Sequence, residues 1–431
     1  MAFLLAGVTP LPCGAQTLTP MSPVPAGAQA DANGRLDPDV ATRAYLDEIP
    51  ADKRAASNQY FEGKYWLTLW DAVYSIVMML LLLYSRVSVK MRDLAERVTR
   101  FRWVHAWIYF AEFSLVTYVL GLPLAVYEGF YREHIYQQSH QAFAGWMRDQ
   151  LVGLAVGVVL GGVFVAVLYA LVRRLPRTWH IWGTVASVAF LAFAALIGPV
   201  YLAPLFNTYK PVANAAVTVP VLKMAHANGI PVNKVVEVDA SKQTTNVSAN
   251  VSGLFGTTRI TLNDNLLNTA SLPEIEAVTG HEMGHYVLNH IVKSIVENAV
   301  LFLVFFSVLK AWLESMQRRR GARWGTRGVD DVALLPAAVM AITVLALLAT
   351  PITNTLVRTQ EAEADMFGLN ASRQPDGFAQ AMLKLAQYRK MEPGPWEERI
   401  FFDHPSGRTR IGAAMRWKAE NARVVKECEG Y

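Results

Sequence analysis

Residues 151–172 read LVGLAVGVVLGGVFVAVLYALV and carry no charged side chain. An uncharged run of this length predicts a helix that crosses a bilayer, because the hydrocarbon core takes about 20 residues of helix. Outward from this stretch, the chain holds further apolar runs that we also expect to span the membrane: residues 66–84, 103–127, 181–206, 291–313 and 332–356.

The composition of the 431-residue chain supports a membrane location. Hydrophobic residues make up 53% and charged residues only 17%, whereas soluble proteins carry about 25% charged residues. The net charge of +5 is small and its arginines sit in short loops, so we expect no nucleic-acid partner. Cys13 and Cys428 lie near opposite ends of the chain, which excludes a disulfide framework or a thiolate metal site.

The order of apolar and polar blocks predicts three parts. Residues 1–36 read as a signal-like or disordered leader, with Ala28-Gln29-Ala30 as a candidate signal-peptidase site. Residues 37–206 form a membrane domain with four spans, and residues 207–431 form a second domain that includes the last two spans. With six spans, the water-facing blocks of the second domain lie on the same side as the N-terminus and can fold together.

The segment that indicates chemistry is residues 279–286, which read TGHEMGHY. On a helix, His281 and His285 are four residues apart and share a face, where they can bind one Zn²⁺ per chain. Glu282 then lies beside the metal, placed to take a proton from the attacking water and to deliver it to the leaving amine. The alternative is an amphipathic helix that carries two histidines and no metal.

A catalytic zinc site needs a third protein ligand. His290 is five residues beyond His285 and rotates off the ligand face of a continuous helix, so we expect a surface or interface histidine. Glu361 and Asp365 share a face of a helix that follows the last span, whereas Glu363 points away. We therefore predict Glu361 as the ligand and Asp365 as its partner or a proton donor. The alternative is an acidic helix start that complements the helix dipole.

The chain resembles the type I CAAX prenyl proteases, integral membrane zinc metalloproteases of the gluzincin kind, from roughly Asp37 to Trp417. The family pattern is His-Glu-x-x-His, then Asn-x-x-Ser-Arg-x-x-Glu-x-x-Ala-Asp, then a late His-Pro followed by Arg. Val357 stands where the family has Ser. The matching residues of this sequence are His281, Glu282, His285, Asn354, Arg358, Glu361, Ala364, Asp365, His404, Pro405 and Arg410.

The resemblance implies a role for most of these residues. It implies that Glu282 is the general base, that Asp365 assists, and that His404 lies by the substrate or the developing oxyanion. We assign Arg358 and Arg410 to substrate binding. The zinc ligands that the resemblance implies are His281, His285 and Glu361.

Residues 248–256 read SANVSGLFG, and the family's Asn-Ala-Tyr is replaced by Ser-Ala-Asn. This segment is expected to be an edge strand that pairs with an extended substrate through Ala249 and Asn250, because main-chain pairing tolerates changes of side chain. The alternative is an ordinary hairpin that turns at Gly256-Thr257-Thr258. The predicted fold is mainly α: a polytopic helix bundle capped by a zincin-like α+β metalloprotease domain with a small sheet.

Basic residues are concentrated in the loops on the side opposite the zinc motif, around residues 86–102, 173–177 and 318–327. The comparable short loop on the zinc side, residues 128–150, holds only Arg132 and Arg148. Because basic loops stay in the cytoplasm, we predict a bacterial inner-membrane protein whose catalytic domain faces the periplasm. Eukaryotic members of the resembled family have this domain in the cytosol.

The predicted function is that of an integral membrane zinc metalloendopeptidase. Its partners would be the lipid bilayer and a polypeptide substrate that is lipidated or delivered by the membrane, with C-terminal processing as the reaction of the resembled family. Two alternatives stay open: a quality-control protease of the heat-shock type, and a non-catalytic transporter or scaffold with a vestigial metal site. The sequence leaves the native substrate open.

Overall fold

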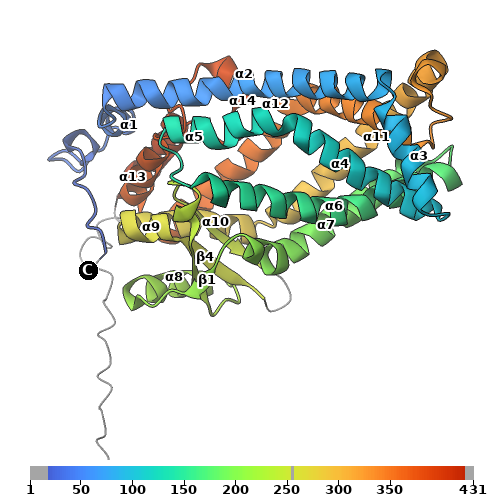
Figure 1. Cartoon of the computed structure of the whole chain (residues 1–431). Helices are drawn as coiled ribbons and strands as arrows, with labels where there is room; N and C mark the ends of the chain where they lie inside the picture. Colours follow the sequence, from blue (N-terminus) through green and yellow to red (C-terminus); the bar gives the residue numbers. More distant parts are fainter. Residues whose placement is uncertain (1–17, 254–256, 423–431) are drawn as a thin grey trace, which may run out of the picture.

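The computed structural model describes residues 18–253 and 257–422. Within them, six helices are long and apolar enough to cross a membrane (Figure 1). Each of these helices covers most of one predicted span. These helices are α2 (Ala51–Tyr84), α4 (Arg102–Val126), α6 (Phe143–Arg174), α7 (Trp179–Ile197), α11 (His290–Trp324) and α12 (Leu335–Ser372).

Most of the spanning helices run beyond their apolar stretches into water. Helix α12 continues from the end of its apolar stretch to Ser372, and α11 continues to Trp324. Many basic residues that the sequence placed in loops therefore lie on helices, in the last turns of α11 and on α3 (Val87–Val98). Charged side chains are costly in hydrocarbon, so we expect these ends of the helices to lie outside the apolar region.

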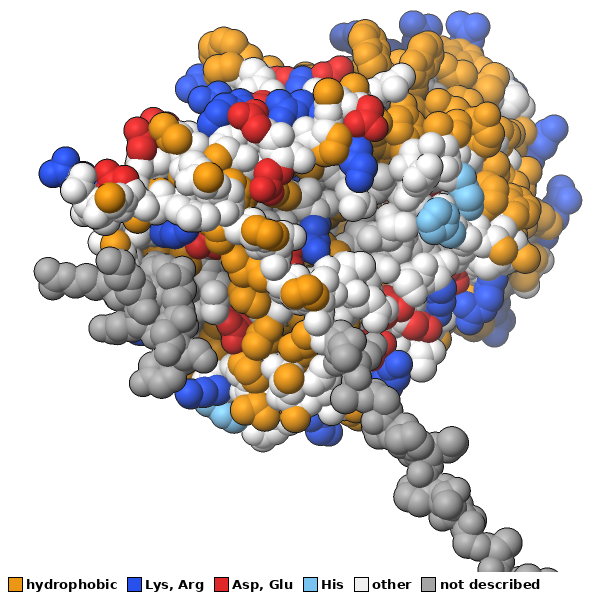
Figure 2. Space-filling model, turned by 90° about the vertical axis from the view of Figure 1, so that its left-hand side faces the viewer, with side chains coloured by type: hydrophobic (Ala, Val, Ile, Leu, Met, Phe, Trp, Pro, Cys, Tyr) orange, Lys and Arg blue, Asp and Glu red, His pale blue; other side chains and the backbone are white. Residues whose placement is uncertain are grey.

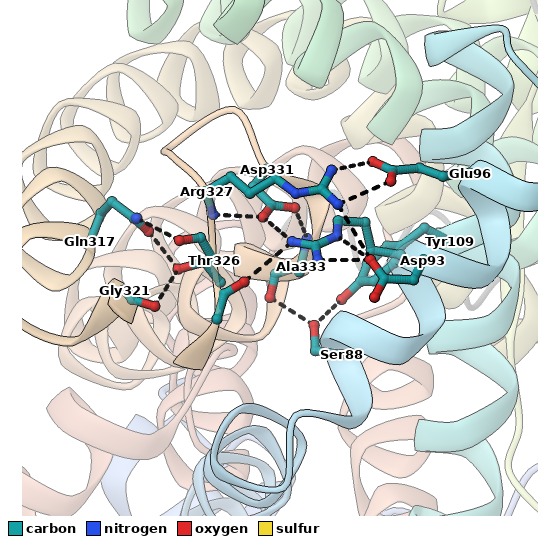
Figure 3. Close-up of polar contacts among 12 residues, drawn as sticks. Ser88, Asp93, Glu96, Tyr109, Gln317, Gly321, Thr326, Arg327, Asp331 and Ala333 are labelled. Atoms are coloured by element: carbon teal, nitrogen blue, oxygen red, sulfur yellow. Dashed lines mark hydrogen bonds and ion pairs between the residues drawn. The ribbon is translucent and has the colours of Figure 1, made fainter. Parts of the chain in front are cut away.

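A polar network closes the end of the bundle that lies farthest from the sheet (Figure 3). Arg92 of α3 pairs with Asp331 at 2.6 Å, and Arg327 pairs with Glu96 at 2.6 Å. Ser88 Oγ donates a hydrogen bond to the carbonyl of Ala333. The pair between Arg92 and Asp331 is buried, so it ties α3 firmly to the connection between α11 and α12.

At the other end, a four-stranded sheet has the order β1-β2-β4-β3. Strands β2 and β4 are parallel, while the outer strands β1 and β3 pair antiparallel with their neighbours. The apolar side chains of β4 pack on the helices of this half, with Ile260, Leu262, Ile275 and Met283 fully buried. The elements are β1 (Tyr209–Pro211), α8 (Ala215–Ala227), β2 (Val235–Val238), β3 (Ala249–Ser252), β4 (Arg259–Asn263), α9 (Asp264–Thr269) and α10 (Leu272–Val287).

Strand β3 has one feature of each reading of residues 248–256, an edge position and a hairpin partner, while pairing with a substrate stays a prediction. It forms the edge of the sheet among the described residues, and it also makes an antiparallel hairpin with β4, with Ala249 opposite Leu262. Gly256, where the alternative put the turn, lies outside the described residues. Among the residues that the structure describes, no further strand pairs with β3 on its outer side.

A second core joins the N-terminal segment to the last helices. Residues 1–36 are predicted as a signal-like or disordered leader, but Ala28 of this segment is fully buried in one cluster with Tyr45 and Phe378. The carbonyl of Ala28 accepts a hydrogen bond from Lys418. Residues 1–17 of the predicted leader lie outside the described residues. The helices of this core and its surroundings are α1 (Pro38–Asp47), α13 (Pro375–Leu385), α14 (Pro395–Phe401) and α15 (Gly407–Glu420).

Hydrophobic and charged side chains are distributed unevenly over the surface. Figure 2 shows hydrophobic side chains gathered on one side of the molecule, while lysine, arginine, aspartate and glutamate are scattered over the rest of the viewed face. Exposed apolar side chains occur on the long helices, among them Leu81 of α2, Val163 of α6 and Val300 of α11, and such side chains suit contact with lipid.

Glycines set the distance between α10 and α12. A Cβ added at Gly368 of α12 would lie 2.7 Å from the backbone nitrogen of His281, and one added at Gly284 of α10 would lie 3.0 Å from Cα of Ala364. Both contacts are with backbone atoms, which cannot swing aside. The two helices can therefore touch only because these side chains are absent.

We expect Gly368→Ala to lower stability by about 1–3 kcal/mol, because the added methyl group overpacks a backbone-to-backbone contact. Thermal unfolding in detergent should register this as a loss of several degrees in Tm. Gly153→Ala in α6, where an added Cβ meets no atom within 4 Å, is the matched control. Equal Tm values for the two variants would contradict the packing account.

Candidate metal centre

The first residues of helix α10 are ones that favour the start of a helix. Ser271 caps it, and its backbone N–H donates to the side chain of Glu274 at 2.6 Å, which closes a capping box. Pro273 occupies the first turn, where its missing N–H costs nothing. From this start, the helical repeat brings His281 and His285 to one face three turns later.

Helix α12 brings the third group to this face. Glu361 Oε2 lies 3.2 Å from His281 Nε2, and Glu361 Oε1 lies 3.4 Å from His285 Nε2. The two imidazole Nε2 atoms are 3.1 Å apart. Three ligand atoms of the types that bind metals therefore meet within 4.8 Å of one another, as predicted.

These separations fit a zinc ion. Ligand atoms at about 2.0–2.1 Å from a tetrahedral Zn²⁺ are about 3.3 Å apart. Glu361 Oε2 is buried, and neither imidazole nitrogen that lies 3.2 Å away, from His281 or from His404, makes a hydrogen bond of good geometry with it. A buried carboxylate oxygen without a donor is costly unless a cation binds it. Geometry and charge thus both favour a metal at this position.

Asp365 lies behind His281, on the side away from the ligand atoms. Its Oδ1 is 2.8 Å from His281 Nδ1, and its Oδ2 accepts a hydrogen bond from Arg410 Nε at 2.8 Å. A carboxylate in this position fixes the tautomer that leaves Nε2 free to bind a metal. Arg410 is buried and reaches the centre through Asp365.

Of the two expectations for His290, a surface or an interface histidine, the first is wrong, because His290 is buried between His285 and Glu363. Its ring is only 3% exposed, and its Nδ1 lies 2.9 Å from His285 Nδ1. His290 Nε2 in turn lies 3.0 Å from Glu363, which also binds Lys293. The helical-wheel argument assumed one continuous helix, but Asn289 takes a left-handed φ of 56°. A new helix starts at His290, and the turn folds its ring onto His285.

The general base of the prediction, Glu282, lies on α10 between the two histidines. Burial raises the pKa of Glu282 to about 7, which suits a group that takes up and returns a proton near neutral pH. Burial, followed by the charge of the His281 ring, lowers the pKa of His285 to about 4. His285 is therefore neutral at pH 7, the form that binds a metal.

His404 also reaches the centre, from the connection between α14 and α15. Its Nε2 lies 3.2 Å from Glu361 Oε2, while its Nδ1 lies 2.9 Å from Asp403. Arg389 approaches Asp403 at 3.8 Å. The structure thus brings His404 beside the three candidate ligands, although it lies far from them in the sequence.

The remaining predicted residues lie around this centre rather than in it. Arg358 donates hydrogen bonds to the carbonyls of Glu398 and Phe402, so it holds the segment that precedes His404. Ala249 is buried and Asn250 exposed on β3, which packs beside α10. Contact between these residues and a substrate stays a prediction.

A cleft of about 750 Å³ opens next to Asp403, the neighbour of His404. Most of its lining residues come from α2, α12 and the segment around α14. The lining includes the charged side chains Lys64, Arg389 and Asp403 and apolar side chains such as Trp66, Leu69 and Leu347.

Two family models match the sequence. The model described as peptidase family M48 matches residues 211–418. The model described as CAAX prenyl protease N-terminal, five membrane helices, matches residues 38–208. In that second range the structure has four of the six long apolar helices, and the shorter α3 lies between two of them.

Individual proteins are similar over much of the chain. The Bacillus subtilis (strain 168) protein named uncharacterized metalloprotease YhfN is 30% identical over 371 residues, which cover 85% of this chain and 86% of that protein. CAAX prenyl protease 1 of Saccharomyces cerevisiae is 26% identical over 258 residues, 57% of this chain and 56% of its own.

The fold is also that of a solved structure. The crystal structure of S. mikatae Ste24p matches with a TM-score of 0.71 at 22% identity, covering 86% of this chain and 90% of that one. This likeness confirms the predicted fold class, a membrane helix bundle joined to a protease-like domain. The six apolar helices and the matched membrane region mark an integral membrane protein.

Replacing His290 should weaken metal binding without removing a ligand. When His285 Nε2 binds a metal, its Nδ1–H donates to His290, and loss of such a partner lowers metal affinity about 10–100-fold. We expect His290→Phe to show this loss when the protein competes with a chelator for Zn²⁺. His140→Phe, at an exposed histidine, is the control. Unchanged affinity in a folded His290→Phe protein would contradict the contact's role.

Proposed function

The chain belongs to peptidase family M48 and is an integral membrane metallopeptidase; from this premise we propose that it uses one Zn²⁺ to cleave polypeptides presented at the bilayer. The observation that carries the proposal is the meeting of His281, His285 and Glu361 beside Glu282. A cleft lined by both charged and apolar side chains lies nearby, and its Asp403 contacts His404, which in turn contacts Glu361. The two imidazoles and the carboxylate would hold the ion.

Each member of the centre then has a separate task. When bound, Zn²⁺ supplies Lewis-acid chemistry that polarises a carbonyl oxygen and makes water more acidic. Glu282 takes a proton from the water that attacks the scissile carbonyl carbon. After the new C–O bond has formed, Glu282 gives that proton to the amine as the C–N bond breaks.

His404 would stabilise charge that develops during the attack. Its ring is fixed between Asp403 and the Glu361 carboxylate, so it needs no reorientation when the reaction begins. A proton on Nε2 would point toward the centre, because this nitrogen lies 3.2 Å from Glu361 Oε2. A preorganised donor of this kind acts where negative charge appears on the carbonyl oxygen.

The open side of β3 would hold the substrate in an extended form. Its neighbour α10 carries the metal ligands, so a strand added to β3 would run past the centre. Main-chain hydrogen bonds would align the peptide whatever its side chains are, and the exposed Asn250 would influence which side chains fit.

A substrate at the membrane suits the cleft best. Its apolar part can take a lipid group or a hydrophobic segment, while Lys64 and Arg389 can meet a negatively charged chain end. We therefore propose processing near the C-terminus of lipidated or membrane-delivered polypeptides. A scaffold with a vestigial metal site is not favoured, because Glu282 and all the ligands are present together.

We further propose that the metal centre faces the periplasm of a bacterial inner membrane. At the far end of the bundle, arginines line one hollow together with Glu96, Asp330 and Asp331; they are Arg92, Arg102 and Arg173 on helices and Arg327 on the connection between α11 and α12. An accumulation of arginine at one end of a bundle is typical of the cytoplasmic face.

Glu282→Gln should abolish cleavage and keep the metal, because the ligands are unchanged and only proton transfer is lost. General acid–base catalysis contributes about 10²–10⁴-fold, so the peptidase rate should fall at least this far. Zinc content measured beside the rate separates the two effects. The control is Glu276→Gln on the same helix, where the amide can still accept the hydrogen bond from Gln374.

The same variant also tests the substrate class. Membrane fractions of Glu282→Gln cells should accumulate uncleaved polypeptides with a shared C-terminal feature. Accumulation of many unrelated misfolded membrane proteins would instead favour a quality-control protease. Equal turnover by Glu282→Gln and the unmodified enzyme would defeat the mechanism itself.

Reporter fusions test the orientation. We expect alkaline phosphatase, which is active only in the periplasm, to work when it is fused at the C-terminus and to be silent when it is fused after Lys90. A fluorescent protein that folds in the cytoplasm should give the opposite pattern at the two sites. Cytoplasmic signal at the C-terminus would reject the periplasmic orientation.

A further inference from the structure

Helix α14 has its polar and apolar sides reversed relative to a helix that faces water. Glu397 turns inward, where it accepts hydrogen bonds from Tyr65 and Lys390 at 2.9 Å each. Glu398 also turns inward and accepts from the backbone of Ser406. The apolar residues face out instead: Trp396 is 71%, Ile400 37% and Phe401 42% exposed. We call these three residues the α14 patch.

The helix lies at the level where two spans leave the apolar region. Phe401 stacks on Tyr65 of α2 at 4.1 Å between ring centroids, one residue before the apolar stretch of α2 begins. Asn354, near the end of the apolar stretch of α12, donates a hydrogen bond to the carbonyl of Ile400 at 2.8 Å. Both contacts put α14 at the boundary between hydrocarbon and water.

We propose that α14 is seated in the bilayer interface, with the α14 patch in contact with lipid. Tryptophan concentrates at this depth, because its ring is apolar and its N–H needs a polar partner. Arg399 lies over the Trp396 ring at 5.1 Å and can extend its charge to the headgroups. The patch continues the lipid-facing surface of α2, where Trp66 and Trp70 are exposed.

This seat would fix the mouth of the cleft at the membrane surface. Ile400 and Phe401 line the cleft together with Trp66, and His404 follows Phe401 by only three residues. A polypeptide held at the interface would therefore reach the metal centre sideways, past α14. This consequence rests on the proposed function, whereas the depth of α14 does not.

The depth can be measured without any substrate. A nitroxide is attached at Trp396→Cys in a chain that also carries Cys13→Ser and Cys428→Ser, and the protein is placed in lipid nanodiscs. Collisions with oxygen report contact with lipid, and collisions with a water-soluble nickel chelate report contact with water. Asp39→Cys on α1 is the aqueous reference, and Leu81→Cys on the exposed face of α2 is the lipid reference.

We expect oxygen to exceed the nickel chelate at position 396, with a ratio between those of the two references. A ratio equal to that of Asp39→Cys would mean that α14 stands in water, and it would overturn the proposal. Protection from both reagents would mean that protein covers the patch, for example a second copy of the chain, and would overturn it as well.

The mouth of the cleft is tested separately with Trp396→Glu and the conservative Trp396→Phe. A charge at this site should lower kcat/KM for a peptide anchored in the bilayer and leave the rate for a soluble peptide unchanged, while Trp396→Phe restores the anchored rate. Equal losses on both peptides would reject sideways entry. If the unmodified protein cleaved neither peptide, the proposed function would fail and the measured depth would stand.

Discussion

The close approach of α10 and α12 is the contact on which the rest of the molecule depends. Gly280 and Gly284 on one helix meet Ala364 and Gly368 on the other, so that backbone lies against backbone. At this distance the carboxylate of Glu361 reaches both imidazoles. With larger side chains at the crossing, the helices would separate, and a carboxylate side chain is too short to bridge the added gap.

Helix α12 links the membrane domain directly to the candidate metal centre. It crosses the apolar region and continues unbroken to Ser372, so the helix that is fixed in the bilayer also carries Glu361 and Asp365. Arg358, between these two parts, holds the carbonyls that lead to His404. Because one continuous helix joins the apolar stretch to Glu361 and Asp365, the distance of the centre from the membrane surface is fixed.

The two imidazoles are supported in different ways. His281 rests directly on Asp365, whose charge is matched by the buried Arg410. His285 rests on His290, and a second carboxylate, Glu363, is reached only through that ring. Each series of contacts ends on a basic side chain, Arg410 behind Asp365 and Lys293 behind Glu363. The negative charges of these two carboxylates are therefore balanced on the side away from the metal position. The face that would receive substrate keeps Glu282 and His404.

The sequence alone determined the features that depend on local pattern: the apolar stretches, the spacing of His281 and His285, and Glu361 as their partner. Only the tertiary structure decided the rest. The turn at Asn289 folds His290 back onto His285, the packing of Ala28 orders residues 18–36, and inward hydrogen bonds expose the apolar side of α14. Periodicity describes one element at a time, whereas these features depend on how elements far apart in the chain meet.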